Sequence, residues 1–329
     1  MQVLAVSFGR EGGNCDILAK KALLGAKAAG CEVRFINTNN LIIERCTNCT
    51  ACDKVFDKGA DAKLCQRPDD FRFVRDAIMD ADGCIFIAPV YSVGVTGQYK
   101  NLLDRMGASH DRAAMMAADK QRKAEGKPGV DPRLFKDRPV AFIPVGGART
   151  PGWTSMGLPM MHLLGLSNQM IPVDYMEGYG MGDRVSPLFD QPYMDRVYQL
   201  GKNVGEQVGL EREKMEWRGD WEGVCPSCHG TTLTYRGDGT KVECTVCGSI
   251  GDLSIEDGRI KITYPAEEIS RGRYQPGGLV EHYEEIQSMV QRFIAVANER
   301  GKEIPELEKE LDFIKSDKPE KRTIIKKLN

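Results

Sequence analysis

Strand-like and helix-like segments alternate along most of this chain, and that alternation limits its fold more than any other feature. The apolar run Gln2–Phe8 ends in a glycine cluster, and Asn14–Ala29 then has the apolar spacing of a helix. Further strand-like runs follow, with helical segments between them. In chain order these are Cys31–Asn37 (strand), Asp69–Asp80 (helix), Gly83–Ala88 (strand), Gly97–Met106 (helix), Pro139–Val145 (strand), Thr154–Leu166 (helix) and Gln169–Asp174 (strand).

Such alternation predicts right-handed crossovers and a parallel sheet with helices on both faces. We expect an α/β fold with a doubly wound, five-stranded sheet in flavodoxin-like order, whose ligands bind at the carboxyl ends of the strands. This domain should cover residues 1–215, with Asp190–Met215 as its last helix. The charged segment Ser109–Arg138 interrupts the pattern, and a solvated surface excursion is favoured there over a lid or a subunit contact.

The composition changes after Trp217. Short turns, cysteines and β-forming residues predict a small β domain over residues 216–265. Residues 266–329 should form a C-terminal region, with a helix at Gly278–Arg300 and a charged tail from Ile304 onward.

Charge and cysteine content restrict the function classes. The 45 basic and 47 acidic residues give a formal net charge of -2, which argues against a nucleic-acid or membrane-surface binder. No apolar stretch reaches the roughly 20 residues that span a bilayer, and the N-terminus has no secretory signal. Eleven cysteines, mostly in C-x-x-C groups, favour metal binding or redox chemistry over disulfides. We therefore expect a cytoplasmic protein.

The first strand-to-helix loop has the composition of an anion site. Residues Ser7–Asn14 read S-F-G-R-E-G-G-N, where backbone N–H groups and the helix dipole converge on a space of phosphate size. The glycines match neither the P-loop nor the dinucleotide G-x-G-x-x-G pattern, so ATP and NAD are not the expected ligands here. Glycines also serve turns that bind nothing, so this loop alone decides little.

The segment after the third strand is more specific. Pro89–Arg105 reads P-V-Y-S-V-G-V-T-G-Q-Y-K-N-L-L-D-R. It resembles the P-x-Y-x-x-x-x-(S/T)-G-x-(L/Y)-K-x-x-x-D-R signature of the NADPH-dependent FMN reductase family, within the flavodoxin-like superfamily, and the resemblance covers roughly residues 1–210. Lys100, Asp104 and Arg105 belong to this motif, but their alternative role is structural, as an ordinary salt bridge at one end of the helix.

The resemblance implies an FMN site and assigns its residues. The phosphate region would be bound by Ser7, Arg10 and Asn14, with Gly12 and Gly13 in the same loop. The ribityl chain and ring would be lined by residues after the third strand, and the ring bordered by small residues after the fourth. These are Pro89, Val90, Tyr91, Ser92, Val93 and Gly94 in the first of these loops, and Gly146, Gly147 and Arg149 in the second.

A cysteine-rich loop follows the second strand. Cys46, Cys49 and Cys52 are spaced to hold three corners of a [4Fe–4S] cube, with Cys65 as fourth ligand. Here the chain resembles the iron–sulfur flavoproteins, although the gap before Cys65 is longer than theirs. The alternatives to the cluster are cysteines that hold no cluster, a redox disulfide and a zinc site. We favour the cluster because all four cysteines fall in one loop beside the expected flavin and because soft thiolates suit iron–sulfur centres. Cys15, Cys31 and Cys84 should be buried core residues.

The small β domain carries two paired cysteine motifs. Cys225 and Cys228, then Cys244 and Cys247, have the spacing of a zinc ribbon whose four thiolates close a tetrahedron. A hairpin turning at Gly237–Gly239 should join the two pairs, with His229 outside the ligand shell. Rubredoxin-like iron is the minority alternative to zinc.

These features together predict an FMN-dependent oxidoreductase or electron-transfer protein. It would take electrons from NAD(P)H or ferredoxin and pass them to an acceptor through FMN and a [4Fe–4S] cluster. The alternatives are a redox sensor that docks a partner through its zinc ribbon, and a carrier with no substrate of its own. No residue is assigned as a general acid or base, and His162 is expected to be a packing residue. By the resemblance, a homo-oligomer, dimer or tetramer, is expected.

Overall fold

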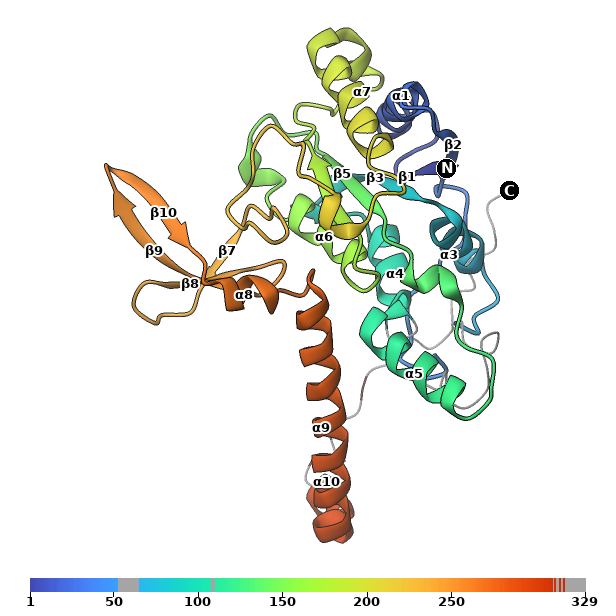
Figure 1. Cartoon of the computed structure of the whole chain (residues 1–329), viewed down its shortest axis with the longest axis vertical. Coiled ribbons are helices and arrows are strands. Elements are labelled where there is room, and N and C mark those ends of the chain that lie inside the picture. Colours follow the sequence, from blue (N-terminus) through green and yellow to red (C-terminus); the bar gives the residue numbers. More distant parts are fainter. Residues whose placement is uncertain (53–64, 108–109, 310, 312–313, 315, 317–329) are drawn as a thin grey trace. The chain divides into compact units, whose positions relative to one another are not determined.

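The computed structural model describes residues 1–52, 65–107, 110–309, 311, 314 and 316 (Figure 1). The chain divides into two compact units, Met1–Glu281 and His282–Asn329. The expected charged tail lies largely outside the described residues, as does the first residue of the 109–138 insertion.

The first unit is built on a parallel sheet. Its strands follow the order β2-β1-β3-β5-β6, and the short β4 pairs antiparallel with the end of β3. This order is the expected flavodoxin-like one, and the fold prediction is confirmed. The strands are β1 (Gln2–Ser7), β2 (Glu32–Asn37), β3 (Gly83–Tyr91), β4 (Gly94–Val95), β5 (Pro139–Val145) and β6 (Ile171–Tyr175).

Two helical layers cover the sheet, and alternation along the strands decides which layer each side chain meets. Leu4 and Val6 of β1 are buried on one face, and Val3 and Ala5 on the other. The first face packs against α3 (Phe71–Asp80), α4 (Gly97–Arg105) and α6 (Gly157–Leu166). The second packs against α1 (Asn14–Ala28) and α7 (Gln191–Gly205), which lie side by side in Figure 1.

Two segments differ from expectation. The last helix ends at Gly205 rather than Met215, and the chain then turns at Gly209, whose φ of +80° suits glycine. The insertion is not a solvated excursion, because it forms α5 (Arg112–Ala124) and a 3₁₀ turn at Pro132–Phe135. Met115 and Leu134 from this segment are buried in one apolar cluster with Met79 of α3. The insertion is therefore an extension of the core.

A second, antiparallel sheet confirms the small β domain. Its strand order is β10-β9-β8-β7, so the expected hairpin between the cysteine pairs is joined by a second hairpin. The ribbon lies in the same compact unit as the parallel sheet. The division at residues 215 and 265 stays a prediction. The elements are β7 (Leu233–Tyr235), β8 (Lys241–Cys244), β9 (Ile250–Glu256), β10 (Arg259–Thr263), α8 (Ala266–Ser270), α9 (Pro276–Arg300) and α10 (Ile304–Lys309).

The contact between α1 and α7 generates the first prediction. A Cβ at Gly201 would lie 1.7 Å from the carbonyl oxygen of Ala22, which is backbone and cannot move aside. Gly201→Ala should therefore lower the free energy of unfolding by about 2–3 kcal/mol, although alanine favours helices by about 1 kcal/mol over glycine. Urea denaturation checks this.

Lys202→Ala on the exposed side of the same helix is the control and should change stability by less than about 0.5 kcal/mol. A Gly201→Ala protein as stable as the Lys202→Ala protein would contradict the close packing of these two helices.

Candidate functional site

Four loops meet at the carboxyl edge of the parallel sheet and enclose a cavity of about 450 Å³. They follow β1, β3, β5 and β6, as the doubly wound topology requires. Seven of the residues expected to bind FMN line this cavity: Arg10, Gly13, Asn14, Pro89, Val90, Tyr91 and Gly147. Residues that sequence reasoning did not assign also line it: Gly9, Cys15, Val145, Met181, Gly182 and Asp183.

The β1 loop has the geometry of an anion site. Gly13 is the N-cap of α1 and offers no side chain to cap the first turn. The N–H of Gly13 donates to the carbonyl of Arg10 and that of Asp16 to the carbonyl of Gly13, so the N–H groups of Asn14 and Cys15 are the ones that could bind a ligand. Gly12 has a φ of +65°, a conformation that suits glycine. The guanidinium of Arg184 lies beside Gly12, and the exposed Arg10 lines the cavity. Positive charge therefore comes from two arginines, one of which, Arg184, sequence reasoning missed.

Ser7 lies beneath this loop rather than in the cavity lining. It is fully buried, and its hydroxyl donates to Oδ1 of Asp16 at 2.6 Å. The same carboxylate accepts from the amide of Asn37 at 2.6 Å and from the backbone N–H of Gly12 at 2.8 Å. Asp16 thus holds the loop in place through these hydrogen bonds. A contact between Ser7 and the phosphate stays a prediction.

The loop after β6 completes the site, and its role was missed. Its backbone pairs with the loop after β5: the N–H of Gly146 donates to Gly178 at 2.8 Å, and that of Met181 returns to Gly146 at 3.0 Å. A Cβ at Gly147 would lie 3.4 Å from the Cα of Gly182, so the two backbones approach closely. The signal was in the sequence, because Gly178, Gly180 and Gly182 alternate directly after the last strand.

Asn14 connects this loop to the start of α1. Its Nδ2 donates to the carbonyls of Met181 at 3.1 Å and Asp183 at 2.7 Å, and to the hydroxyl of Ser186 at 3.2 Å. Its Oδ1 accepts from the backbone N–H of Val185 at 2.8 Å. The side chain therefore positions one wall of the cavity relative to another.

The remaining expected residues surround the cavity without lining it. Ser92 and Val93 form the turn between β3 and β4, with φ of 49° and 73°. Such a conformation is strained for valine, and strained backbone is common near functional sites. Gly94 follows in β4, Gly146 is buried under Thr154, and Arg149 is exposed. Their contacts with a ligand stay predictions.

The shape and donors of this cavity suit a flat, phosphorylated cofactor such as FMN. A Cβ at Gly9 would lie 2.7 Å from the side chain of Cys15, and one at Gly13 would lie 2.9 Å from the carbonyl of Arg10. Only glycine fits at both positions, so the backbone itself forms the wall. Arg10, Asn14 and Cys15 line the cavity at the start of α1, and Arg184 lies beside Gly12 of the same loop, so these groups would hold a phosphate, while Tyr91 and Val145 line other parts of the cavity.

The cysteine-rich loop forms a separate, smaller cavity of about 170 Å³. It is lined by all four expected cysteines, Cys46, Cys49, Cys52 and Cys65, together with Arg67 and Arg105 among others. The pKa of Cys49 is lowered, first by the backbone N–H of Ala51 and also by the charge of Arg67. Residues 53–64 between Cys52 and Cys65 lie outside the described part of the chain.

Helix α4 holds the segment that leads into this loop. Gln98 Nε2 donates to the carbonyls of Thr38 at 2.5 Å and Leu41 at 3.1 Å, and Asn101 Nδ2 donates to that of Ile43 at 2.8 Å. Arg105 donates from Nη1 to the carbonyl of Glu44 at 3.1 Å. Spacings of three and four residues place these side chains on one face of the helix.

Lys100, Asp104 and Arg105, for which a structural salt bridge was the alternative, form two different ion pairs. Lys100 and Asp104 form an exposed ion pair within the helix. The buried Arg105 instead binds Asp69 through two hydrogen bonds of 2.6 and 2.9 Å. Burial acts to raise the pKa of Asp69, but the bonds from Arg105 and from two backbone N–H groups outweigh it, and the pKa is lowered. Asp69 therefore stays ionised as the counter-ion of Arg105.

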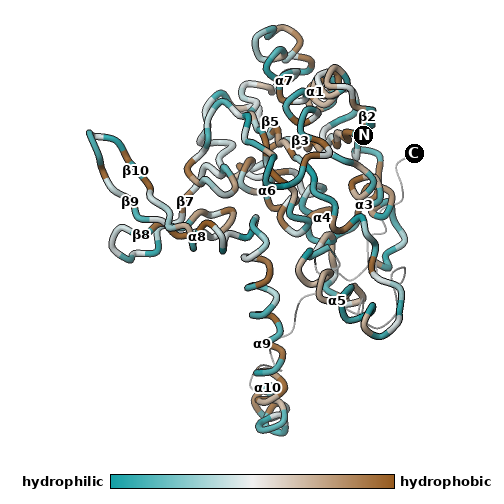
Figure 2. The backbone as a smooth tube through the Cα atoms, in the orientation of Figure 1, coloured by the Kyte–Doolittle hydropathy of each residue, from teal (hydrophilic) through white to brown (hydrophobic). Residues whose placement is uncertain are grey.

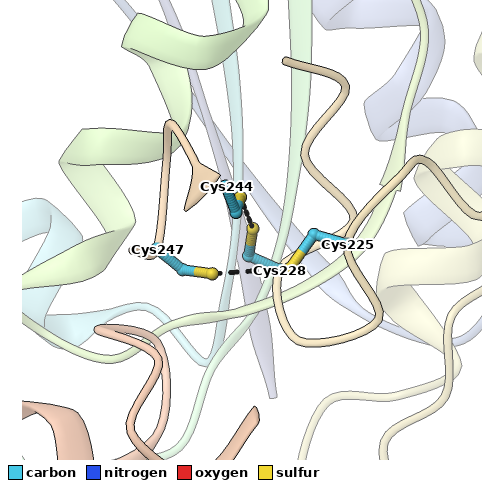
Figure 3. A group of neighbouring side chains, drawn as sticks. All are labelled: Cys225, Cys228, Cys244 and Cys247. Carbon is cyan, nitrogen blue, oxygen red and sulfur yellow. Dashed lines mark hydrogen bonds between the residues drawn. The ribbon is translucent and has the colours of Figure 1, made fainter. Parts of the chain in front are cut away.

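The ribbon brings its four cysteines together in the buried interior (Figure 3). Their sulfur atoms all lie within 4.8 Å of one another, with Cys225 and Cys247 at 3.4 Å and Cys228 and Cys244 at 3.5 Å. A tetrahedral metal with bonds of about 2.3 Å places its sulfurs close to such distances. This is the one group of three or more metal-ligating side chains that the described residues form, and it fits a four-coordinate ion.

His229 lies outside that sulfur tetrahedron. Its ring stacks on Trp217 at 4.1 Å between centroids, and its Nδ1 is 3.0 Å from the carbonyl oxygen of Glu222. His229 and Gly248 each follow the second cysteine of a pair and have φ of 57° and 80°. Both cysteine pairs therefore turn in the same way, and the stacking holds His229 in a conformation that is usually taken by glycine.

The Asn14 contacts generate the second prediction. Asn14→Ala removes four hydrogen bonds, each contributing about 1 kcal/mol, so residues 181–186 should exchange amide hydrogen faster and flavin should bind about tenfold more weakly or worse. Hydrogen exchange and flavin titration measure the two effects. The control is Asn39→Ala, an exposed asparagine away from the cavity lining. Unchanged exchange at 181–186 would show that Asn14 does not hold this loop.

The buried sulfur group generates the third prediction. The ribbon core consists mainly of the four cysteines with Val246 and Tyr274, so loss of the metal removes what holds it together. Cys244→Ser should abolish metal binding and unfold residues 225–263, while the parallel sheet stays folded. Metal analysis and hydrogen exchange check this, with Thr245→Ala as control. A Cys244→Ser ribbon that keeps its protection from exchange would be the contrary result.

Comparison with known proteins agrees with this geometry. The NADPH-dependent FMN reductase family matches residues 1–175. A flavone synthase of Aspergillus candidus is 28% identical over 296 residues, covering 88% of this chain and 90% of that protein. An iron–sulfur flavoprotein of Methanocaldococcus jannaschii is 30% identical over 173 residues, covering 53% and 75%.

A solved structure of a flavone reductase superposes with a TM-score of 0.81 at 29% identity, covering 97% of this chain and all of that one. In the described part of the chain, no helix combines the length and apolar character needed to span a membrane. The glycine-walled cavity at the carboxyl edge of a flavodoxin-like sheet and the match over residues 1–175 lead to the same conclusion: this chain belongs to the NADPH-dependent FMN reductase family.

Proposed function

We propose that this protein is an FMN-dependent oxidoreductase that takes electrons from NAD(P)H or ferredoxin and passes them to an acceptor. The observation that carries this proposal is the cavity of four loops at the sheet edge, in a member of a flavin reductase family. FMN supplies the redox chemistry, since it accepts two electrons together and can release them singly.

The chain's own residues bind and orient the cofactor. Gly13 and the first turn of α1, with Arg10 and Arg184, would hold the phosphate, and Asn14 would keep the β6 loop in place against it. Burial raises the pKa of Cys15 to about 12, so this thiol in the cavity wall stays protonated at neutral pH and does not act as a nucleophile. We assign no proton donor.

The cysteine-rich loop would hold a [4Fe–4S] cluster through Cys46, Cys49, Cys52 and Cys65. Support comes from the common cavity that these residues line, the lowered pKa of Cys49 and the similarity to iron–sulfur flavoproteins. Such a cluster passes one electron at a time. The cysteine cavity and the flavin loop after β3 adjoin opposite ends of the nine-residue α4, which is about 14 Å long.

A planar aromatic acceptor, such as a flavone, is the substrate class we propose. A flavone synthase and a flavone reductase each match nearly the whole chain. Tyr91, which lines the cavity, is 63% exposed, and Trp153, shortly after the β5 loop, is 70% exposed. Exposed aromatic rings next to a flat cofactor would stack on a flat substrate.

The ribbon would hold a zinc ion whose role is structural, because four thiolates leave no open position. A second candidate function, redox sensing with partner docking through the ribbon, is favoured by one observation. Ile255 of β9 and Ile260 of β10 face each other across the second hairpin and are 73% and 70% exposed. Tight binding of a protein at this hairpin with slow flavin reduction would favour this candidate.

The proposed function gives the fourth prediction, tested on protein prepared without oxygen. Cys49→Ala should keep FMN and still be reduced by the donor, and it should still reduce a flavone, because neither step needs the cysteine loop. Transfer to a one-electron dye should fall at least tenfold. Stopped-flow spectroscopy follows all three steps, and Cys31→Ala, a buried cysteine outside the loop, is the control.

Two results would count against this scheme. Undiminished one-electron transfer in Cys49→Ala would leave the cysteine loop without a relay role. Wild-type flavin that neither NAD(P)H nor reduced ferredoxin reduces would contradict the oxidoreductase itself.

A further inference from the structure

Two arginine side chains in the cavity of the cysteine-rich loop have Nε–H groups without a hydrogen-bond acceptor. Arg67 and Arg105 line this cavity together with the four cysteines. The Nε atom of each is buried, and neither has a partner among the residues that the structure describes. Folded proteins rarely leave a buried donor unpaired, because it has lost its hydrogen bonds to water. Two such donors in one cavity indicate that a ligand with acceptor atoms belongs there.

The orientation of Arg105 is fixed by its neighbours. Helix α4 is largely hydrophilic (Figure 2), and its Lys100 and Asp104 side chains are 47% and 38% exposed, whereas the side chain of Arg105 is fully buried. The Cζ atom of Arg105 lies 4.3 Å from the centre of the Phe71 ring, and both Nη atoms bind the carboxylate of Asp69. The Nε edge of the guanidinium is therefore the part that remains for a ligand.

The two arginines act on different cysteines of the loop. Burial acts to lower the pKa of Arg105, but the carboxylate that it binds and the thiol of Cys65 outweigh burial, and the pKa is raised. The pKa of Cys49 is lowered first by the backbone N–H of Ala51 and also by the charge of Arg67. Each donor is thus associated with one corner of the proposed ligand set.

The chemistry of the acceptor narrows the choice of ligand. Neutral sulfur, in a thiol or a disulfide, is a weak acceptor and would leave both donors without a strong partner. Thiolates and the sulfides of an iron–sulfur cluster carry negative charge, and hydrogen bonds to charged acceptors are roughly twice as strong. The two donors therefore fit the ligated form of the loop, and this inference rests on the cluster of the proposed function.

Hydrogen bonds to the sulfur atoms of a cluster change its reduction potential. Reduction adds one electron and makes these sulfur atoms more negative, so a nearby N–H donor stabilises the reduced form more than the oxidised form. The potentials of iron–sulfur centres depend on such hydrogen bonds, on net charge and on solvent exposure.

We propose that Arg67 and Arg105 donate their Nε–H groups to sulfur atoms of the cluster and so make the cluster easier to reduce. The four cysteines are the ligands, and the arginines set the potential. A higher cluster potential favours transfer of one electron from the reduced flavin, which is oxidised by one electron as the cluster is reduced by one.

Titration of anaerobically prepared protein, loaded with flavin and cluster, against a redox dye tests the proposal. Arg67→Gln removes one donor at a partly exposed residue and should lower the equilibrium constant for cluster reduction about tenfold, or about 59 mV for one electron. Arg105→Lys keeps a cation for Asp69 without an Nε–H group and should act similarly. The control is Arg45→Gln, which removes an exposed charge next to Cys46 and outside the cavity lining. At high salt it should change the constant by less than about twofold.

Two further measurements separate a lost hydrogen bond from a lost structure. Arg67→Gln should keep the wild-type flavin potential and the wild-type content of iron and sulfide. The Fe–S stretching bands in the resonance Raman spectrum should shift when wild-type protein is transferred to D₂O, and shift less in Arg67→Gln, because the exchangeable donor is gone.

An unchanged cluster potential in both Arg67→Gln and Arg105→Lys would overturn this inference and leave the cluster itself in place. An equal change in Arg45→Gln would do the same, since it would reduce the effect to general charge. A wild-type loop that holds zinc, or that lacks iron and sulfide, would instead overturn the cluster of the proposed function together with this inference.

Discussion

Close approach of backbone to backbone at the carboxyl edge of the sheet is the constraint on which the site depends. Gly147 and Gly182 bring the β5 and β6 loops together, and Gly13 leaves no space between the β1 loop and α1. Side chains are absent from these positions, so main-chain groups form the cavity wall. The same close approach recurs between α1 and α7, where Gly201 places that helix against Ala22. Glycine thus sets both the packing and the binding geometry.

The cysteine-rich loop is connected to the flavin cavity through α4. One face of this helix holds the chain between β2 and the cysteine loop, and its last residue, Arg105, is fixed by Asp69. The pair is buried, so removing either partner would leave an uncompensated charge. The helix therefore determines how far the cysteine cavity lies from the flavin cavity, and this distance would matter for the electron transfer that we propose.

Much of the fold and part of the site followed from local patterns. Apolar runs and the Pro89–Arg105 motif identified the sheet order and the β3 loop, and the paired cysteines identified the ribbon, because their signals lie in neighbouring residues. The β6 loop was missed because its role depends on pairing with residues some thirty positions earlier. Asn14 was assigned to the phosphate, yet its amide bonds to that loop, and only the folded chain brings the two together. The packed insertion was missed for the same reason, since Met115 finds Met79 across the fold.

Analysis of the cofactors in anaerobically purified protein tests the central claim most directly. We expect one FMN and one zinc per chain, with iron and acid-labile sulfide in equal amounts. The flavin should be released by denaturation, and iron and sulfide should be lost together when Cys46 or Cys49 is replaced. Release of FAD, or a protein that binds no flavin after reconstitution, would contradict the assignment of the sheet-edge cavity.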